Sequence, residues 1–332
     1  MNAVELENLR KTFVQKTGRG FSRVTKEIVA VDSVSFAVPV GQSVAFIGPN
    51  GAGKSTTIKM LTGILQPTSG TAHVLGAVPW KERNKLTYNI GAVFGQRSQL
   101  WYHLPPRDTF DLLARIYSLN TLEYKKRADM LIERFALNVF LDTPVRKLSL
   151  GQRMRAEIAA SLLHKPKVLF LDEPTIGLDV IARQELRDLI SEWNRDEGLT
   201  IFLTSHDAGD IESVAKRVIV INHGRVVLDD TVSAMKRQYL CEKVIGVKFH
   251  DEHKSFNVPG VKILKSNVHA LKLEVDTRVT AIEKVLHEVM QTGSVADITI
   301  EDPPLEEIIA HIYGQGPADV LPDREEEVTK VE

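Results

Sequence analysis

The sequence contains one cysteine, Cys241, and no hydrophobic run that approaches the length of a membrane-spanning helix. One cysteine cannot form an internal disulfide, which suits a reducing compartment. A bilayer span needs roughly 18 apolar residues, and a signal peptide needs a basic and then an apolar segment, so we predict neither. The formal net charge of −1 provides no overall field that favours nucleic acid. We therefore expect a soluble, cytoplasmic protein without a nucleic-acid partner.

Apolar runs and helical stretches alternate over the first two thirds of the chain. The runs, typical of strands buried on both faces, lie at 43–47, 167–171, 200–204 and 217–221. Helical stretches between them predict βαβ units and an α/β fold with a parallel sheet. The segment from about 97 to 165 is rich in helical patterns, which predicts a helical subdomain inserted into the α/β core.

The pattern changes after about residue 240. Strand patterns at 244–249, 271–275 and 296–300 accompany helical patterns at 280–291 and 305–313. We therefore predict a first domain over 1–240 and a small α+β accessory domain over 241–314. Residues 315–332 contain prolines and clustered acids with little to bury, which predicts a disordered tail.

The stretch GPNGAGKST, residues 48–56, follows an apolar strand and opens a helix, which is the context that the P-loop pattern requires. Its glycines let backbone N–H groups converge on phosphate oxygens, and the helix N-terminus adds a positive dipole end. Lys54 would reach the β- and γ-phosphates of ATP, and the Ser55 hydroxyl would ligate Mg²⁺. A generic strand-to-helix loop is the alternative. The predicted nucleotide contacts are Gly48, Asn50, Gly51, Gly53, Lys54, Ser55 and Thr56.

A pair of acids follows the next buried strand in the stretch VLFLDEPT. Four apolar residues deliver Asp172 and Glu173 to the carboxyl end of that strand, where α/β sheets bind their ligands. Unpaired buried carboxylates are costly, so two adjacent acids here favour a functional site over a solvated turn. We predict that Asp172 holds Mg²⁺ and that Glu173 is the base that activates water.

The stretch LSLGQ, Leu148 to Gln152, precedes the strand that carries these acids. Ser149 and the backbone of Gly151 would open a helix whose positive end can face a γ-phosphate, although a simple N-cap at Ser149 is the alternative. With this stretch the chain resembles the ATP-binding cassette (ABC) ATPases, the nucleotide-binding subunits of ABC transporters. Their signature is LSGGQ, and Leu150 replaces its first glycine. The resemblance implies a P-loop NTPase core and a nucleotide contact by Ser149, Gly151 and Gln152.

Four further residues match motif positions of the same family. The resemblance implies that Gln96, in VFGQ, senses Mg²⁺ and the attacking water, and that His206, in LTSHD, contacts the γ-phosphate. It places Asp179, in GLD, in a loop that crosses to a partner subunit, with Ile176 where serine is common. Phe13, in NLRKTF, matches the aromatic residue that stacks on adenine. A structural histidine at 206 and a core role for Phe13 are the alternatives.

The resemblance covers about residues 3–238 and implies an ATP hydrolase that works as a head-to-tail pair of subunits. We expect a homodimer that drives a separate integral membrane permease and lies through it on the inner face of the membrane. Trp101, Tyr102 and His103 occupy the position where the family docks its permease, with core packing as the alternative. The residues in and around these motifs are similar to those of ABC-2 type exporter ATPases. An importer ATPase and a non-transport ABC ATPase are the alternatives.

Overall fold

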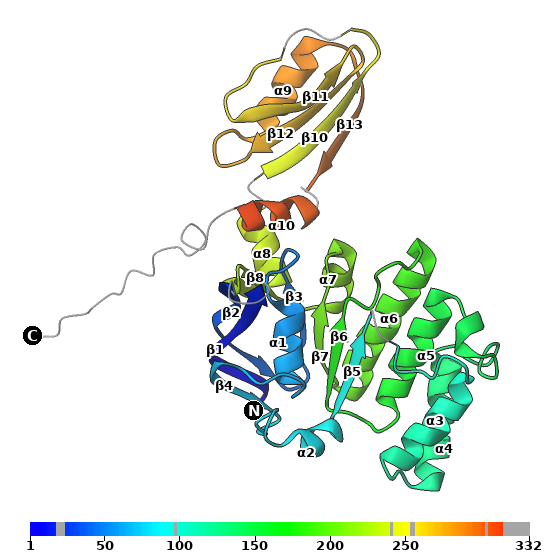
Figure 1. The fold of residues 1–332 in the computed structure, drawn as a ribbon. Coiled ribbons are helices and arrows are strands. Elements are labelled where there is room, and N and C mark those ends of the chain that lie inside the picture. Colours follow the sequence, from blue (N-terminus) through cyan, green and yellow to red (C-terminus); the bar gives the residue numbers. More distant parts are fainter. Residues whose placement is uncertain (18–23, 96–97, 240–241, 253–255, 303–304, 315–332) are drawn as a thin grey trace, which may run out of the picture. The chain divides into compact units, whose positions relative to one another are not determined.

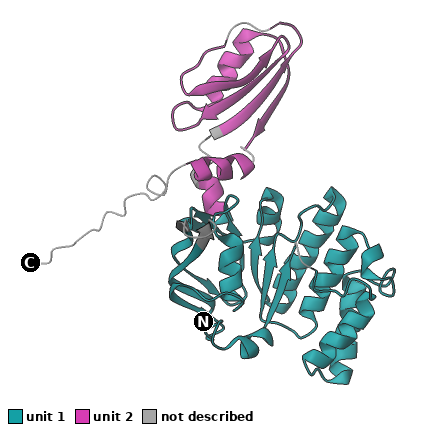
Figure 2. Cartoon of the chain, viewed as in Figure 1, with its two compact units in different colours: residues 1–232, 315–332 teal, residues 233–314 magenta. Residues whose placement is uncertain are grey.

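The computed structural model describes residues 1–17, 24–95, 98–239, 242–252, 256–302 and 305–314. Figure 2 shows that the chain divides into two compact units, residues 1–232 and residues 233–314. This division lies a little before the boundary expected at 240, so almost all of helix α8 (Val232–Tyr239) belongs to the second unit.

Two of the sequence predictions fall outside the described residues: Gln96 and the tail at 315–332. Among the helices that the structure does describe, none combines the length and the apolar character needed to cross a membrane.

Six strands form the main sheet of the first unit, in the order β5, β6, β7, β3, β8, β9 (Figure 1). Their bounds are Ile90–Phe94 for β5, Val168–Asp172 for β6, Thr200–Thr204 for β7, Ser43–Ile47 for β3, Arg217–Asn222 for β8 and Arg225–Thr231 for β9. The first five run parallel, and β9 pairs with β8 in the antiparallel direction. The predicted α/β class and parallel sheet are confirmed, with β5 and β9 as strands that the sequence did not reveal.

The central strands are continuously apolar because their alternate side chains enter two separate cores. Leu169 and Leu171 of β6 lie in a core with the helices α3, α4, α5 and α6. Phe170, between them, lies in a second core with α1 and an antiparallel sheet. The helix bounds are Lys54–Leu61 for α1, Pro106–Ile116 for α3, Thr121–Arg134 for α4, Leu150–Leu162 for α5 and Val180–Glu197 for α6. Burial on both faces therefore explains the pattern that identified these strands.

An antiparallel sheet of β1 (Asn2–Thr17), β2 (Val24–Pro39) and β4 (Ser69–Val74) completes the second core. Phe36 on β2 packs against Phe46 on β3 and Phe202 on β7, with ring centroids 5.7 and 6.0 Å away, and the Phe46 and Phe202 centroids lie 5.3 Å apart. These aromatic contacts join the two sheets at the level of the strand that leads into the P-loop.

Three short helices complete the first unit: α2 (Arg83–Thr87), the 3₁₀ helix η1 (Val145–Lys147) and α7 (Ala208–Val214). Helix η1 leads into α5, and α7 follows β7 along the chain. The LSLGQ motif therefore lies at the N-terminus of α5, and the LTSHD motif runs from the end of β7 to Asp207, the N-cap of α7.

The second unit contains a four-stranded antiparallel sheet in the order β11, β12, β10, β13. The strand bounds are Glu242–Phe249 for β10, Val261–Asn267 for β11, Ala270–Asp276 for β12 and Val295–Glu301 for β13. Helix α9 (Ile282–Thr292) buries Val285 and Val289 against the inner face of this sheet. Helix α10 (Leu305–Gly314) ends the described chain. The unit therefore has a hydrophobic core of its own.

Candidate nucleotide site

The P-loop joins the end of β3 to the start of α1, and two of its glycines have no room for a side chain. A Cβ at Gly48 would lie 2.1 Å from the Ile221 carbonyl oxygen, and one at Gly53 would lie 2.4 Å from the Ala30 carbonyl oxygen. Gly53 also has a φ of 107°, which L-residues rarely adopt. The loop is therefore held close to β8 and β2, with the first turn of α1 at its end.

Lys54 is buried, and its ammonium group closes the loop upon itself. Nζ donates to the Gly48 carbonyl at 2.7 Å and to the Pro49 carbonyl at 3.2 Å. Burial lowers the pKa of Lys54 below its usual value, while the carboxylates of Glu173 and Asp172 act in the opposite direction. A cation held this way, beside a helix N-terminus, is placed to meet phosphate oxygens.

Asp172 ends β6 and connects the P-loop to the neighbouring strand β7. One carboxylate oxygen, Oδ1, accepts from the Ser55 hydroxyl at 3.2 Å and from the Thr204 hydroxyl at 2.6 Å. Asp172 and Thr204 face each other in the strand register, which is why their side chains meet. A hydroxyl and a carboxylate are oxygen donors of the kind that Mg²⁺ uses, so Ser55 and Asp172 fit the predicted metal site.

Glu173 follows in a strained backbone conformation that turns its carboxylate toward His206. Its φ of 54° lies in the left-handed region, which is uncommon for a residue other than glycine. Its N–H donates both to the carbonyl and to the hydroxyl of Thr204, each at 3.1 Å. Thr204 thus orients both acids.

His206 lies between the predicted base and the P-loop lysine. Its Nε2 is 2.8 Å from Glu173 Oε1 and 3.1 Å from Lys54 Nζ. A neutral imidazole nitrogen can donate to Glu173 or accept from Lys54, but it cannot do both at once. The structure therefore brings Lys54, Glu173 and His206 into one chain of polar contacts.

Ser149 and Gly151 open α5 and make their contacts within α5 and with α6. The Ser149 hydroxyl accepts from the Gln152 N–H at 3.2 Å, and the Ser149 N–H donates to Gln152 Oε1 at 3.0 Å, which forms a capping box. A Cβ on Gly151 would lie 3.1 Å from Ala182 Cβ. Leu150 packs against the helical core. Ser149 itself is exposed, so the capping role suggested as an alternative is present in the structure without burying the residue.

Asp179 caps α6, since its Oδ1 accepts from the Ala182 N–H at 2.9 Å. The residues around it are apolar and project into solvent: Ile176 is 49% exposed, Val180 80% and Ile181 74%. Large apolar side chains exposed together mark an interaction surface more often than scattered ones do. Only Ile176 of this group was identified from the sequence.

The aromatic residues whose burial the sequence left open are exposed. Phe13, on β1 opposite Ile28, is 40% exposed, and Lys11 Nζ lies 5.3 Å from the centre of its ring. Trp101 and Tyr102 are 40% and 58% exposed. The structure therefore does not support core packing for any of the three.

Comparison with known proteins identifies the family. The protein family described as ABC transporter matches residues 31–176. The daunorubicin resistance ATP-binding protein DrrA3 of Streptomyces coeruleorubidus is 31% identical over 290 residues, which cover 86% of this chain and 91% of that protein. The linearmycin resistance ATP-binding protein LnrL of Bacillus subtilis is 28% identical over 320 residues, which cover 94% of this chain and 98% of that protein. The bacitracin transport ATP-binding protein BcrA of Bacillus licheniformis is 35% identical, covering 64% and 69%.

Solved structures give the same result. A dimeric ATP-binding cassette in a post-hydrolysis state, bound to ADP and Pi, is 26% identical with a TM-score of 0.60, covering 69% of this chain and 98% of that one. The cbiO1 subunit from Clostridium perfringens, part of the ABC transporter complex cbiONQ, is 29% identical with a TM-score of 0.60, covering 71% and 94%. The chain therefore belongs to the ABC transporter family as an ATP-binding subunit that hydrolyses ATP.

Proposed function

We propose that this subunit powers export through a separate integral membrane permease, as a homodimer that closes head-to-tail on ATP. The observation that carries the proposal is the division of the predicted nucleotide contacts into two groups. Lys54 and Glu173 both contact His206, whereas the bonds of Ser149 lie within α5 and Gly151 approaches Ala182 on α6. Two copies in opposite orientation would complete each site with the second group from the other copy.

Within one site, the P-loop would bind the triphosphate and Lys54 would exchange its loop carbonyls for phosphate oxygens. Ser55, Asp172 and Gln96 would hold Mg²⁺, which when bound neutralises charge on the β- and γ-phosphate oxygens. Phe13 would stack on adenine through its exposed ring.

For hydrolysis, the Glu173 carboxylate would accept a proton from water as the water oxygen bonds to the γ-phosphorus and the bond to the leaving ADP oxygen breaks. His206, at 2.8 Å from the same carboxylate, would orient the base and contact the γ-phosphate. Gln96 would sense the attacking water together with the metal.

The closed pair would need the signature helix and the crossing loop of the second copy. Ser149, Gly151 and Gln152 of the partner subunit would face the γ-phosphate, with the positive end of that helix directed toward it. The exposed side chains of Ile176, Val180 and Ile181, which flank Asp179, support a contact between subunits. The dimeric state of a similar cassette supports the same arrangement.

The direction of transport and the permease are supported by two further observations. Relatives are named for linearmycin resistance, daunorubicin resistance and bacitracin transport, which favours export of drugs or similar bulky molecules. Exposed Trp101 and Tyr102, beside exposed His103, provide an aromatic surface of the kind that anchors protein interfaces. Docking there would hold the subunit on the inner face of the membrane.

The proposal is tested by expressing the chain with and without a candidate permease, a polytopic membrane protein sought in the reading frames next to its gene. We expect the chain to fractionate with membranes only when that protein is present, and Trp101→Ala with Tyr102→Ala to release it while its ATPase activity remains. Cells with both proteins should accumulate less of a fluorescent drug such as daunorubicin, and Glu173→Gln should abolish the difference. Increased accumulation would identify an importer, and co-fractionation with ribosomes would identify a non-transport protein.

A further inference from the structure

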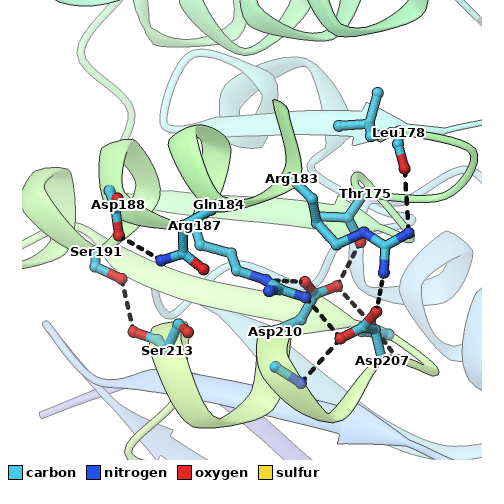
Figure 3. Close-up of polar contacts among 12 residues, drawn as sticks. Thr175, Leu178, Arg183, Gln184, Arg187, Asp188, Ser191, Asp207, Asp210 and Ser213 are labelled. Atoms are coloured by element: carbon cyan, nitrogen blue, oxygen red, sulfur yellow. Dashed lines mark hydrogen bonds and ion pairs between the residues drawn. The ribbon is translucent and has the colours of Figure 1, made fainter. Parts of the chain in front are cut away.

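Figure 3 shows a network of two arginines, Arg183 and Arg187, and two aspartates, Asp207 and Asp210, of which Asp207 directly follows His206 in the chain. Its centre is Asp210 on α7, which is fully buried. The Asp210 carboxylate accepts from Arg187 Nε at 2.7 Å, from the Thr175 hydroxyl at 2.5 Å and from the Ser205 hydroxyl at 2.5 Å. Thr175 lies two residues after Glu173, and Ser205 lies directly before His206. The buried Asp210 carboxylate therefore connects the segment that carries Glu173, the predicted base, to the segment that carries His206.

The residue on the other side of His206 belongs to the same network. Asp207 accepts from Arg187 Nη2 at 2.6 Å and also from Arg183 Nη1. Its own N–H donates to the Ser205 hydroxyl at 3.0 Å. His206 is thus held through both of its neighbours, while its imidazole is left to contact Glu173 and Lys54.

Arg183 extends the network into the crossing loop. Besides Asp207, it bonds through Nη2 to the Leu178 carbonyl at 3.1 Å, and Leu178 directly precedes Asp179. The planar guanidinium suits this double role, because its N–H groups point in different fixed directions and can serve two acceptors at once. A displacement of the crossing loop would therefore pull on the carboxylate next to His206.

The network is electrically balanced, with two guanidinium groups facing two carboxylates. Such balance is required for Asp210, because a buried carboxylate that loses its partner destabilises the fold strongly. Arg187 is also largely buried, with an 11% exposed side chain, whereas the Arg183 side chain is 30% exposed. Arg183 is therefore the member that can be removed with the smaller structural cost.

We infer that Arg183 and Arg187 are positioning residues that hold His206 against Glu173 and link its position to the crossing loop of the same chain. The inference rests on the proposed role of His206 in hydrolysis. It assigns the arginines no contact with ATP. Their removal should therefore slow the chemical step and leave nucleotide affinity unchanged.

The test compares Arg183→Gln with Arg195→Gln. Arg195 lies on the same helix, and its side chain is 73% exposed. We expect Arg183→Gln to lower kcat about tenfold while the Kd for ATP changes by less than about twofold. Arg195→Gln should match the wild type in both. Arg183→Lys should recover only part of kcat, because one ammonium group cannot hold both Asp207 and the Leu178 carbonyl.

A double-mutant cycle separates positioning from a general structural effect. If Arg183 acts through His206, adding Arg183→Gln to His206→Ala should cause little further loss of the residual turnover. Two results would overturn this inference and leave the proposed role of His206 intact. One is that Arg183→Gln lowers kcat by the same factor in the wild type and in His206→Ala. The other is that Arg183→Gln keeps wild-type kcat although His206→Ala is impaired. Wild-type kcat in His206→Ala would instead overturn the proposed role of His206, and the inference with it.

Discussion

At the scale of single residues, the site depends on a few groups at the carboxyl ends of adjacent parallel strands. Asp172 and Thr204 end β6 and β7, and the P-loop leaves the end of β3. The main sheet places β7 between β6 and β3, so these ends meet at one edge. Lys54 and His206 then close the site through direct contact.

Lys54→Ala should lower ATPase activity about 100-fold or more and weaken ATP binding, because it removes the point charge next to the phosphates. Lys59→Ala, which changes an exposed lysine on the same helix, is the matched control. Turnover assays and nucleotide titration of both purified variants check this. Unchanged turnover in Lys54→Ala would show that the P-loop assignment is wrong.

Glu173→Gln should retain ATP binding and lose hydrolysis, because the amide keeps the shape of the side chain but cannot accept the proton. General bases contribute about 10²- to 10⁴-fold, so the loss should lie in that range. Glu123→Gln, at an exposed position on α4, should behave as wild type. Near wild-type turnover in Glu173→Gln would instead point to Asp172 as the base.

At the scale of elements, α5 is connected to the segment that follows β5 through a buried acid. Glu157 lies on the buried side of α5, and its Oε2 accepts from the Gln99 N–H at 3.5 Å. Burial raises the pKa of Glu157 above its ordinary value of 4.5. The ionised carboxylate is therefore less favourable in the folded protein than in the unfolded chain.

Glu157→Gln should accordingly stabilise the protein at neutral pH, with a gain in Tm of about 2 °C or more. Because Glu157 binds its proton more tightly in the folded state, the free energy of unfolding falls as pH rises from about 4.5 through the pKa of folded Glu157. Above that pKa the destabilisation is complete. The gain of the variant should grow over the same window and vanish near pH 3. Glu133→Gln, at an exposed position on α4, is the control. A gain independent of pH would contradict this account.

The elements that the sequence revealed are those with one uninterrupted pattern. Strands at 43–47 and 200–204 were predicted with their observed bounds, because burial on both faces makes them continuously apolar. Strand β1 was missed because register shifts and the left-handed Asn8 interrupt its alternation. Helix α6 was expected only as a helical stretch between two strands, without bounds, because only a narrow face of it is buried.

The same distinction applies to the site. The P-loop, the acid pair and His206 lie in short local motifs, and the structure brings Lys54, Glu173 and His206 together. The arginine network could not be predicted, because Arg183 and Arg187 meet acids that lie 20 or more positions away in the chain. Pairing of this kind depends on how α6 and α7 pack. No local pattern records it.

At the scale of the whole molecule, the two compact units each bury a core of their own, and all predicted nucleotide contacts lie in the first. A chain that ends at residue 239 should therefore fold and bind ATP with a Kd within about twofold of the full chain. Circular dichroism and nucleotide titration check this expectation. A folded truncation without ATP binding would show that the second unit contributes to the site.

The central claim is that each ATP site is shared between two copies, and the mass of Glu173→Gln in Mg-ATP tests it most directly. Blocking hydrolysis should trap the closed pair. Light scattering should therefore report a mass of twice 37.1 kDa, the mass of one chain, in Mg-ATP, and a mass of 37.1 kDa without nucleotide. Adding Ser149→Arg should restore the mass of a single chain without loss of ATP binding, because a bulky cation would occupy the surface that receives the γ-phosphate. A double variant that still dimerises on ATP would contradict the shared site.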